Sequence, residues 1–466
     1  MPFPRTKIVC TLGPASNSRD TLRSLMEAGL SIARLNFSHG THEQHAETVA
    51  MVRETARELS RPVAILGDLQ GPRIRIGDLD APRDVRDGQD VVLVPGENAQ
   101  GDQFPTTYAH LCDDLRVGDR ILIDDGLIEL VALEVTPASV TARVLHGGRI
   151  KSHKGINLPG VSVSAPSITE KDWADVAFAV QHELDYLALS FVRRAEDITE
   201  LREKIPRHML VVAKIEKDSA LENIESIVLA SDAVMVARGD LGVELPFEEV
   251  PIAQKRIISL CNKLGRPVIT ATQMLESMIT HPRPTRAEAS DVANAIFDGT
   301  DAVMLSAETA AGKYPRLAVE AMTRIITEIE RHPREPRDER TDPEVAVSTE
   351  QAIAAAATSA VRSLRAPALI VFTKSGFSAR IIAAHRPDVP ILVLTDQERT
   401  YRQLALVWGV VPCLVQHCAT YQDMVQLALD AVRDRGLAVA GDRVVVTAGV
   451  PFDVPGTTNL MKVETV

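Results

Sequence analysis

The sequence predicts an α/β protein that consists of a (β/α)8 TIM barrel, an inserted antiparallel β-barrel lid domain and a C-terminal α/β domain. Three observations predict this architecture. Short apolar runs alternate with helix-length segments in residues 1–70 and 161–345, residues 71–160 alternate apolar and polar side chains, and a further α/β pattern occupies residues 346–466. At about 150 residues per domain, a chain of 466 residues has room for about three domains.

The first part of the barrel, residues 1–70, is expected to contain three strands separated by amphipathic helices at residues 19–28 and 42–59. Nearly continuous apolar runs between helices are typical of a parallel sheet that helices cover. The expected strands are Lys7–Gly13, Ser31–Phe37 and Val63–Asp68.

Residues 71–160 interrupt this pattern with alternating strands and Gly/Asp turns, which indicates a small antiparallel β domain inserted in an α/β domain. Helix–strand alternation resumes at residue 161, and five more strands bring the total to eight, the number that closes a (β/α)8 barrel. The expected strands of the insert are Val91–Val94, Arg120–Gly126, Leu127–Val131 and Val140–Val144, and those of the second barrel segment are Tyr186–Ser190, Leu210–Glu216, Ala233–Ala237, Pro267–Ala271 and Ala302–Ser306.

A linker is expected at residues 331–347, where the chain is charged, rich in proline and without an apolar period. The C-terminal unit is expected to open with an Ala-rich helix at Gln351–Leu364. Its expected strands are Ala368–Phe372, Ile391–Thr395, Val410–Val415 and Arg443–Thr447.

The composition excludes several classes of function. The chain has 51 Lys and Arg against 63 Asp and Glu, a formal net charge of −12, and only 4% aromatic residues, so a nucleic-acid-binding surface is not expected. No apolar run reaches the roughly 18 residues of a membrane-spanning helix. Residues 1–5 lack the apolar core of a signal peptide and the five cysteines lack metal-type spacing, so we expect a cytoplasmic protein with reduced thiols.

Polar residues cluster where the expected barrel strands end. The carboxyl ends of the strands of a parallel barrel meet at one mouth, where catalytic groups lie. A single such residue can equally be a helix cap or half of a buried ion pair, but six strands that end this way favour a catalytic mouth. The residues are Arg34, Asn36, Ser38, Asp68, Lys214, Glu216, Arg238, Gly239, Asp240, Thr272, Gln273, Ser306 and Glu308.

Two of these residues, Lys214 and Glu216, are two positions apart on one expected strand, so both side chains point to the same face. Together with Asp240 after the next strand, they place two carboxylates at one locus. This arrangement suits Mg²⁺, which usually takes one or two carboxylates and leaves positions for phosphate and water. A structural Lys–Glu pair is the alternative. Backbone amides at Gly239 offer a further site for an anion.

Seven segments in the same order closely resemble motifs of one known family. They are RTKIVCTLGPAS from Arg5, ARLNFSHG from Ala33, KGINLP from Lys154, AKIE from Ala213, MVARGDLG from Met235, ATQMLESM from Ala271 and PTRAE from Pro284. The family that they resemble is pyruvate kinase, and the resemblance runs from Arg5 to the C-terminus. It implies transfer of the phosphoryl group of phosphoenolpyruvate to ADP, which gives ATP and pyruvate in the last step of glycolysis.

The resemblance also assigns roles to individual residues. Glu216 and Asp240 would hold Mg²⁺, with Mn²⁺ as the alternative cation, and Asp240 would also bind the substrate carboxylate together with Gly239 and Thr272. The implied catalytic residues are Lys214, Arg34 and Thr272: Arg34 grips the phosphate, Lys214 neutralises charge on the phosphoryl group and the enolate oxygen, and Thr272 relays a proton through water. The residues expected to face ADP or ATP are Asn36, His39, Arg75 and Lys154.

One segment departs from the usual family pattern. Members that need K⁺ usually read DTKGPEIRT after the third strand, whereas this chain reads DLQGPRIRI from Asp68. Arg73 replaces the glutamate of that pattern and puts a fixed cation near the place where K⁺ would offset the acid, so we expect activity without K⁺. The chain nevertheless retains the residues that bind K⁺ in K⁺-dependent relatives, namely Asn36, Ser38 and Asp68.

The last domain contains a loop of hydroxyl-bearing residues between a strand and a helix. Hydroxyls and amides at a helix start suit a phosphate group, and the equivalent loop of the family receives a sugar-phosphate or AMP effector. Ordinary helix capping is the alternative. The loop residues are Thr373, Lys374, Ser375, Gly376 and Ser378.

Two other functions are weighed against pyruvate kinase activity. The first is a Mg²⁺-dependent enolate lyase or aldolase on a similar barrel, but the inserted domain, the Arg34–Asn36 segment and Lys214 favour nucleotide phosphoryl transfer. The second is a non-catalytic homologue that senses sugar phosphate, which the retained metal and substrate residues disfavour. The resemblance also implies a homotetramer.

Overall fold

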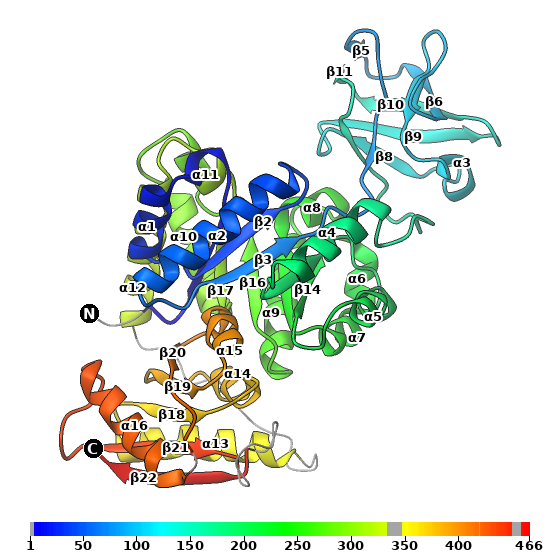
Figure 1. Ribbon diagram of the computed structural model, residues 1–466. Coiled ribbons are helices and arrows are strands. Elements are labelled where there is room, and N and C mark those ends of the chain that lie inside the picture. The colour runs from blue at the N-terminus through cyan, green and yellow to red at the C-terminus, as the bar shows by residue number, and fades with distance from the viewer. Residues whose placement is uncertain (1–3, 333–346, 419, 450–457) are drawn as a thin grey trace.

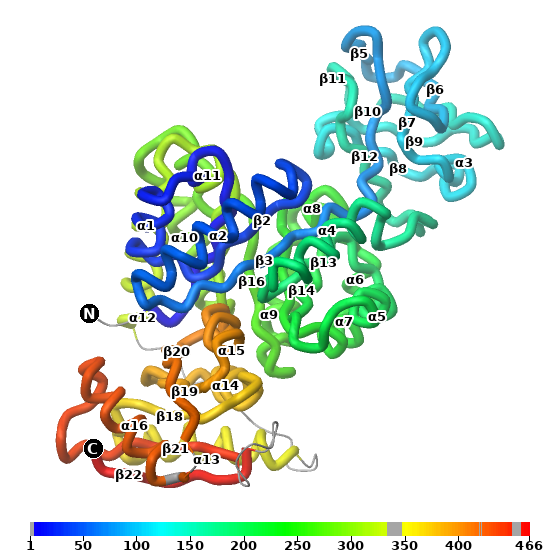
Figure 2. The backbone as a smooth tube through the Cα atoms, viewed as in Figure 1, coloured from blue at the N-terminus to red at the C-terminus, as the bar shows by residue number. Residues whose placement is uncertain are grey.

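The structure is a computed structural model that describes residues 4–332, 347–418, 420–449 and 458–466. It has three parts (Figure 1): a central barrel, a β domain that projects from one end of the barrel, and an α/β unit at the opposite end. Two neighbouring chain segments connect the β domain to the barrel (Figure 2). The expected linker at residues 331–347 falls almost entirely outside the described residues.

Eight parallel strands form the closed barrel, and the sequence predicts all eight. Nearly all of their side chains are buried, because one face of each strand packs against helices and the other fills the barrel. The strands, in order around the barrel, are β1 (Lys7–Thr11), β17 (Ala302–Leu305), β16 (Val268–Ala271), β15 (Ala233–Ala237), β14 (Leu210–Ile215), β13 (Tyr186–Leu189), β3 (Ala64–Asp68) and β2 (Ile32–Asn36).

Helices form the outer layer of the barrel (Figure 1). Their starts follow the usual capping rules: α2, for example, begins with a box in which Thr41 and Gln44 cap each other's backbone. Three short helices follow strands at the mouth: α6 (Asp218–Glu222), α8 (Arg238–Glu244) and α11 (Ala307–Ala310). The outer helices are α1 (Arg19–Ala28), α2 (His42–Glu58), α4 (Glu170–Gln181), α5 (Ala195–Lys204), α7 (Ile224–Ala230), α9 (Val250–Lys263), α10 (Arg286–Asp298) and α12 (Pro315–Arg331).

The inserted β domain, called the lid below, contains a seven-stranded sheet in the order β4-β12-β8-β9-β10-β6-β7. A bridge between Ile76 and Thr106 joins the two edges, so the sheet is barrel-like. The prediction of an antiparallel domain is wrong for one pair, because β6 and β7 run parallel after a loop rather than a hairpin. The elements are β4 (Ile74–Arg75), β5 (Arg83–Val85), β6 (Asp90–Pro95), β7 (Phe104–Thr106), α3 (Leu111–Asp114), β8 (Arg120–Ile123), β9 (Ile128–Val135), β10 (Val140–His146), β11 (Gly148–Ile150) and β12 (Gly155–Asn157).

The C-terminal unit is a five-stranded sheet in the order β20-β19-β18-β21-β22. The sequence predicts four of these strands but not the antiparallel edge strand β22, whose side chains are mostly exposed and give no apolar run. The elements are α13 (Thr349–Leu364), β18 (Leu369–Phe372), α14 (Phe377–Ala384), β19 (Ile391–Thr395), α15 (Glu398–Gln403), η3 (Leu404–Leu406), β20 (Val410–Leu414), α16 (Tyr421–Asp434), β21 (Arg443–Ala448) and β22 (Leu460–Thr465).

The short helix η3 closes the end of the barrel that faces the C-terminal unit. Its last two residues are buried in one apolar cluster with inward-facing barrel residues such as Leu66 and Met304. The hydroxyl of Tyr186 donates a hydrogen bond to the carbonyl of Gln403 at 2.6 Å, and the Gln403 amide donates to the carbonyl of Asp185 at 3.2 Å. Only the opposite end, which carries the lid, is left for a substrate.

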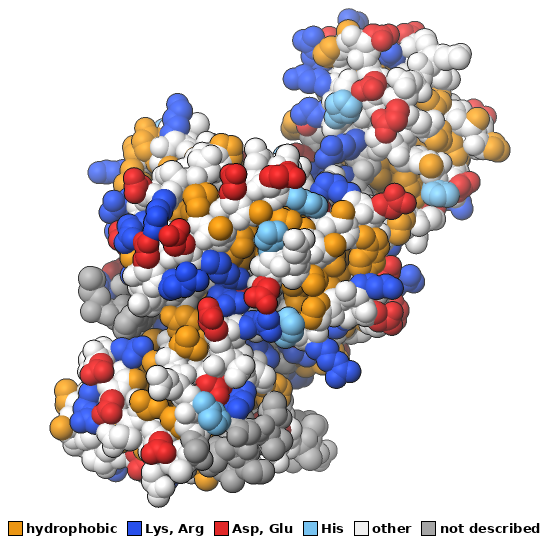
Figure 3. Space-filling view, in the orientation of Figure 1, with side chains coloured by type: hydrophobic (Ala, Val, Ile, Leu, Met, Phe, Trp, Pro, Cys, Tyr) orange, Lys and Arg blue, Asp and Glu red, His pale blue; other side chains and the backbone are white. Residues whose placement is uncertain are grey.

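The surface mixes both signs of charge. Figure 3 shows acidic and basic side chains interspersed over one face of all three parts. Within the described ranges, no helix is long and apolar enough to cross a lipid bilayer.

Candidate active site

A buried group of charged side chains lies at the lid end of the barrel, with Lys214 at its centre. The Lys214 ammonium lies 3.2 Å from Asp68 Oδ1 and 2.8 Å from Glu216 Oε1, and it donates a 2.6 Å hydrogen bond to Ser190 Oγ. Both carboxylates are 1% exposed and Lys214 is 8% exposed. The predicted placement of Lys214 and Glu216 on one face of a strand is confirmed, and the two side chains also form an ion pair. Asp68 and Ser190, from two other strands, add further partners to Lys214.

Arg34 extends this network to the strands on the other side of Asp68. Its Nε donates to Asp68 Oδ2 at 2.7 Å, and its Nη1 donates to Thr11 Oγ1 at 2.8 Å. Asp68 is therefore shared by two cations, which hold its carboxylate in one orientation. Such hydrogen bonds between ionised groups are stronger than neutral ones.

The charged side chains of this group shift one another's pKa values. Burial alone would lower the pKa of Lys214, but the carboxylates of Asp68 and Glu216 outweigh it and raise that pKa. Burial would raise the pKa of Asp68, yet the charges of Lys214 and Arg34 lower it. For Glu216, burial raises the pKa to about 7, because the nearby charge of Asp240 adds to burial and Lys214 only partly opposes it.

Glu216 is buried close to Asp240, and Lys214 offsets the negative charge at this place only in part. A divalent cation held between the two carboxylates would supply further positive charge. In the described part of the chain no group of three or more His, Cys, Asp or Glu side chains forms a metal site, but two carboxylates suffice for Mg²⁺, which keeps several waters and phosphate oxygens as ligands. The residues present therefore fit Mg²⁺.

The neighbouring strand ends hold Thr272 and Gly239 against each other. Thr272 adopts a left-handed backbone with φ of 68°, and its hydroxyl accepts a 2.8 Å hydrogen bond from the Gly239 amide. A Cβ at Gly239 would lie 3.3 Å from that hydroxyl, so the close approach favours glycine. Arg238 fixes the same turn by donating to the carbonyl of Thr272 at 2.8 Å and to Asp291 at 2.8 Å.

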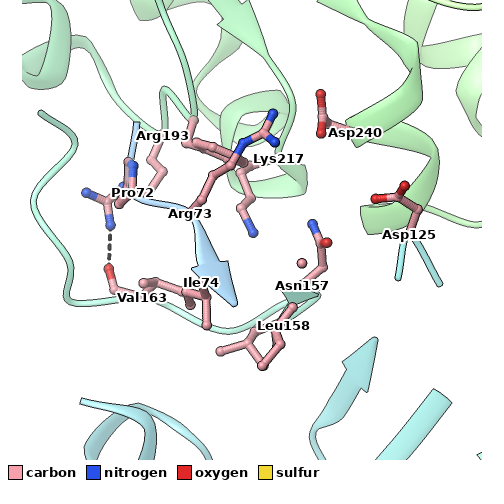
Figure 4. Close-up of a pocket in the computed structure, with 13 residues that line it drawn as sticks. Pro72, Arg73, Ile74, Asp125, Asn157, Leu158, Val163, Arg193, Lys217 and Asp240 are labelled. Atoms are coloured by element: carbon pink, nitrogen blue, oxygen red, sulfur yellow. Dashed lines mark hydrogen bonds between the residues drawn. The ribbon is translucent and has the colours of Figure 1, made fainter. Parts of the chain in front are cut away.

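A pocket that is open to solvent lies between the lid and the barrel (Figure 4). It brings Arg73 to the same cavity as Asp240, although Arg73 itself is exposed. The lining residues are Pro72, Arg73, Ile74, Asp125, Gly155, Ile156, Asn157, Leu158, Val163, Phe191, Arg193, Lys217 and Asp240.

The four residues expected to face the nucleotide do not line this pocket. Lys154 pairs with Asp124 inside the lid at 2.7 Å. Asn36 accepts a hydrogen bond from the Ser38 amide at 3.1 Å. His39 is exposed and Arg75 is partly exposed.

The loop expected to bind an effector lies in the C-terminal unit. Thr373 Oγ1 accepts a 3.0 Å hydrogen bond from the Gly376 amide, and Gly376 has a φ of 77°. Ser378 hydrogen-bonds Thr458, and the ammonium of Lys374 lies 3.7 Å from Asp396. The side chain of Ser375 is exposed.

The sequence reasoning missed several residues around the site. Ser190 binds Lys214, and the Phe191 amide donates to Glu216 Oε2 at 2.7 Å. Ser190 carried a detectable signal, because it is a polar residue at the end of an expected strand. Lys217, Arg193 and Asp125 carried none, since only folding brings them to the pocket.

The fold and this site define a (β/α)8-barrel enzyme whose one open mouth gathers buried cations and carboxylates for an anionic substrate. Comparisons with known proteins identify its family. A model of the pyruvate kinase barrel domain matches residues 3–319, and a model of the pyruvate kinase alpha/beta domain matches residues 351–464.

Individual relatives agree with these matches. Pyruvate kinase of Geobacillus stearothermophilus is 48% identical over 472 aligned positions, which cover 99% of this chain and 80% of the relative, and that of Staphylococcus haemolyticus is 45% identical with the same coverage. The crystal structure of a pyruvate kinase from Cryptosporidium parvum matches with a TM-score of 0.95 and 36% identity, over 99% of this chain and 96% of the other. The chain belongs to the pyruvate kinase family and is a phosphotransferase.

The shared position of Asp68 leads to a prediction about pH. Replacing Asp68 with Asn removes a negative charge that stabilises protonated Lys214, so the pKa of Lys214 falls. The alkaline limb of the turnover profile is expected to move about 1–3 pH units toward lower pH. Steady-state turnover against pH measures this shift. The same substitution at Asp90, which pairs with Arg143 on the lid surface, is the control, and an unmoved alkaline limb in Asp68→Asn would contradict the prediction.

Proposed function

We propose that this chain transfers the phosphoryl group of phosphoenolpyruvate to ADP at the lid end of the barrel. The observation that carries the proposal is the buried network in which Lys214 and Arg34 share Asp68. Phosphoryl transfer needs alignment and stabilisation of charge more than covalent chemistry by the protein. Both cations are fixed before substrate arrives, so they offset phosphate charge with little reorganisation.

Mg²⁺, or Mn²⁺ in its place, would be held by Glu216 and Asp240 and would neutralise charge on the phosphate and enolate oxygens. Arg34 would bind the phosphate, and Lys214 would face the bridging oxygen that becomes the enolate. The amide of Gly239 and the hydroxyl of Thr272, which bind each other in this structure, would turn to the substrate carboxylate. We place the route of the proton to the enolate through water at Thr272.

We also infer that Asn36, His39, Arg75 and Lys154 reach ADP only after the lid moves, because none of them lines the present pocket. Closure of a lid would exclude water from the transferred phosphoryl group. The division into a barrel of residues 1–70 and 161–345, a lid of residues 71–160 and a regulatory unit of residues 346–466 belongs to the same proposal.

An assay of pyruvate formation from phosphoenolpyruvate, ADP and Mg²⁺ tests the activity. Replacing Lys214 with Met is expected to lower turnover by about 10²–10³-fold, because it removes a fixed charge from the transition state, while the affinity for phosphoenolpyruvate changes little. Lys255→Met is the control, since Lys255 is an exposed lysine that also pairs with a carboxylate. Absence of ADP-dependent pyruvate from the wild-type chain would refute the proposal.

The proposal includes independence of K⁺. The side chain of Arg73 has no hydrogen bond or ion pair with any described residue, and it lines the pocket that Asp240 also lines. Its guanidinium is therefore available to provide the positive charge that K⁺ supplies in K⁺-dependent relatives. Asp68, one of the retained K⁺-ligand residues, already pairs with Arg34 and Lys214.

Replacing Arg73 with Glu is expected to create a dependence on K⁺, because the variant regains an acid and loses its fixed cation. Turnover is measured with K⁺ and with tetramethylammonium at equal ionic strength. Arg86→Glu makes the same charge change elsewhere on the lid surface and serves as control. A wild-type enzyme that needs K⁺, or an Arg73→Glu variant that ignores it, would contradict this part of the proposal.

We further propose that the loop Thr373–Ser378 binds the phosphate of a sugar-phosphate or AMP effector. The exposed hydroxyl of Ser375 and the turn at Gly376 support this role. The alternative is that the loop only leads into α14, because the Thr373 hydroxyl accepts a hydrogen bond from the amide of Gly376, the N-cap residue of that helix.

Calorimetric titration with AMP and with glucose 6-phosphate tests the effector loop. Ser375→Asp is expected to weaken binding of the phosphate at least about tenfold by like-charge repulsion. Thr420→Asp is the matched control, because Thr420 caps α16 in the same unit. If neither ligand binds or alters the substrate saturation curve, the loop serves only as a cap.

A homotetramer in the cytoplasm completes the proposal. Large apolar side chains are exposed on the neighbouring helices α9 and α10 and on the turn before α9, with Ile252 69%, Phe297 56% and Phe247 84% exposed. Exposed apolar groups of this kind support contact with another subunit. All five cysteines are free thiols, as is usual in a reducing compartment.

A further inference from the structure

A second buried ion pair lies between the lid and the barrel, and none of the roles above uses it. Glu244, the last residue of α8, has a side chain that is 1% exposed. Its Oε1 accepts a 2.6 Å hydrogen bond from the Lys217 ammonium and a 3.2 Å hydrogen bond from the Asn157 side-chain amide. The Asn157 amide and the Lys217 ammonium lie near each other at the pocket (Figure 4).

Two of the three residues, Lys217 and Glu244, lie on the chain segments that carry the proposed metal ligands, and Asn157 lies on the lid. Asn157 ends β12, the last lid strand before the chain returns to the barrel. Lys217 directly follows Glu216, and α8 carries Asp240 in its first turn. A movement of the returning lid segment therefore changes the position of Glu244 through its hydrogen bond with Asn157. Glu244 is connected to Asp240 through α8 and to Glu216 through Lys217, so the movement affects both proposed metal ligands.

The other connecting segment of the lid also touches this group. The ring of Phe191 packs against Gly71, because a Cβ at Gly71 would lie only 2.8 Å from a ring carbon. The Phe191 amide binds Glu216, and its ring centroid lies 6.0 Å from the Lys217 ammonium. Both lid connections thus converge on the same few side chains.

Glu244 also has unused hydrogen-bonding capacity. Its Oε2 is buried and accepts no hydrogen bond in the described structure. A buried acceptor without a donor costs free energy, so any movement of the lid that brings another donor to Oε2 is favoured by that amount.

We propose that Glu244, held by Lys217, is a positioning residue that couples the position of the lid to the divalent-cation site. The inference rests on the proposed metal role of Glu216 and Asp240. A cation held by Glu216 and Asp240 would tie α8 to the segment Glu216–Lys217, and Glu244 at the end of α8 in turn holds the lid residue Asn157 by a hydrogen bond. By the reciprocity of coupled equilibria, lid closure strengthens cation binding by the same factor.

The test measures cation binding and lid order without turnover. Mn²⁺ affinity of the free enzyme is determined by electron paramagnetic resonance, and hydrogen exchange of residues 155–160 is followed with and without Mg²⁺. In Glu244→Gln and in Lys217→Met, Mn²⁺ affinity is expected to fall about tenfold, as for other residues that orient metal ligands. The Mg²⁺-dependent protection of residues 155–160 seen in the wild type is expected to disappear.

A matched control lies at the other end of the barrel. Asp298 accepts hydrogen bonds from Lys255 and from the side-chain amide of Gln254, as Glu244 does from a lysine and an amide. Asp298→Asn is expected to leave both the Mn²⁺ affinity and the Mg²⁺-dependent protection of residues 155–160 at wild-type values. If a single variant at Glu244 or Lys217 unfolds, the double variant Lys217→Gln/Glu244→Gln, which leaves no unpaired charge, provides the measurement.

Two outcomes would overturn the inference, and they differ in whether the proposed metal site is refuted as well. If the wild type binds Mn²⁺ and the variants keep both its affinity and its protection, Glu244 is only a structural ion pair and the proposed activity stands. If the wild type binds no Mn²⁺, the proposed metal site fails together with the coupling.

Discussion

The charge of Lys214 is the constraint on which the rest of the structure depends. A buried ammonium is tolerated only when carboxylates and hydrogen-bond acceptors surround it, and here they come from three different strands: Asp68 from β3, Ser190 from the end of β13 and Glu216 from the end of β14. The pairing of β3 with β13 and of β13 with β14, in this register, brings them together. The fold thus creates the site, and the ion pairs in turn favour one register of the strands.

The two ends of the barrel show why the site lies where it does. At one end, η3 of the C-terminal unit fills the barrel with apolar side chains, and Tyr186 binds the carbonyl of Gln403. Water and a charged ligand are excluded there. The other end is open to the pocket beneath the lid, so buried charges at that end can exchange protein partners for substrate.

The sequence is sufficient to predict what depends on local pattern. Buried strands appear as apolar runs, and the spacing of Lys214 and Glu216 places them on one face. It is insufficient where tertiary packing decides. The exposed strand β22 has no run of apolar residues that would mark it. The parallel pairing of β7 with β6 depends on the path of the loop that connects them. Glu244 contacts Asn157 only because the chain returns from the lid beside α8. The family resemblance supplied residue roles, but it did not reveal these contacts.

The local charges explain how a chain with a net charge of −12 can attract an anionic substrate. Arg34 and Lys214 lie against the carboxylates of Asp68 and Glu216, and Arg73, Arg193 and Lys217 line the adjoining pocket together with Asp240. Several cations therefore meet at this mouth although the chain as a whole is acidic. The proposed divalent cation at Glu216 and Asp240 would add to this positive charge. The proposed metal would thus favour binding of the substrate phosphate, and a lid coupled to the metal site would close preferentially over a site that holds the metal.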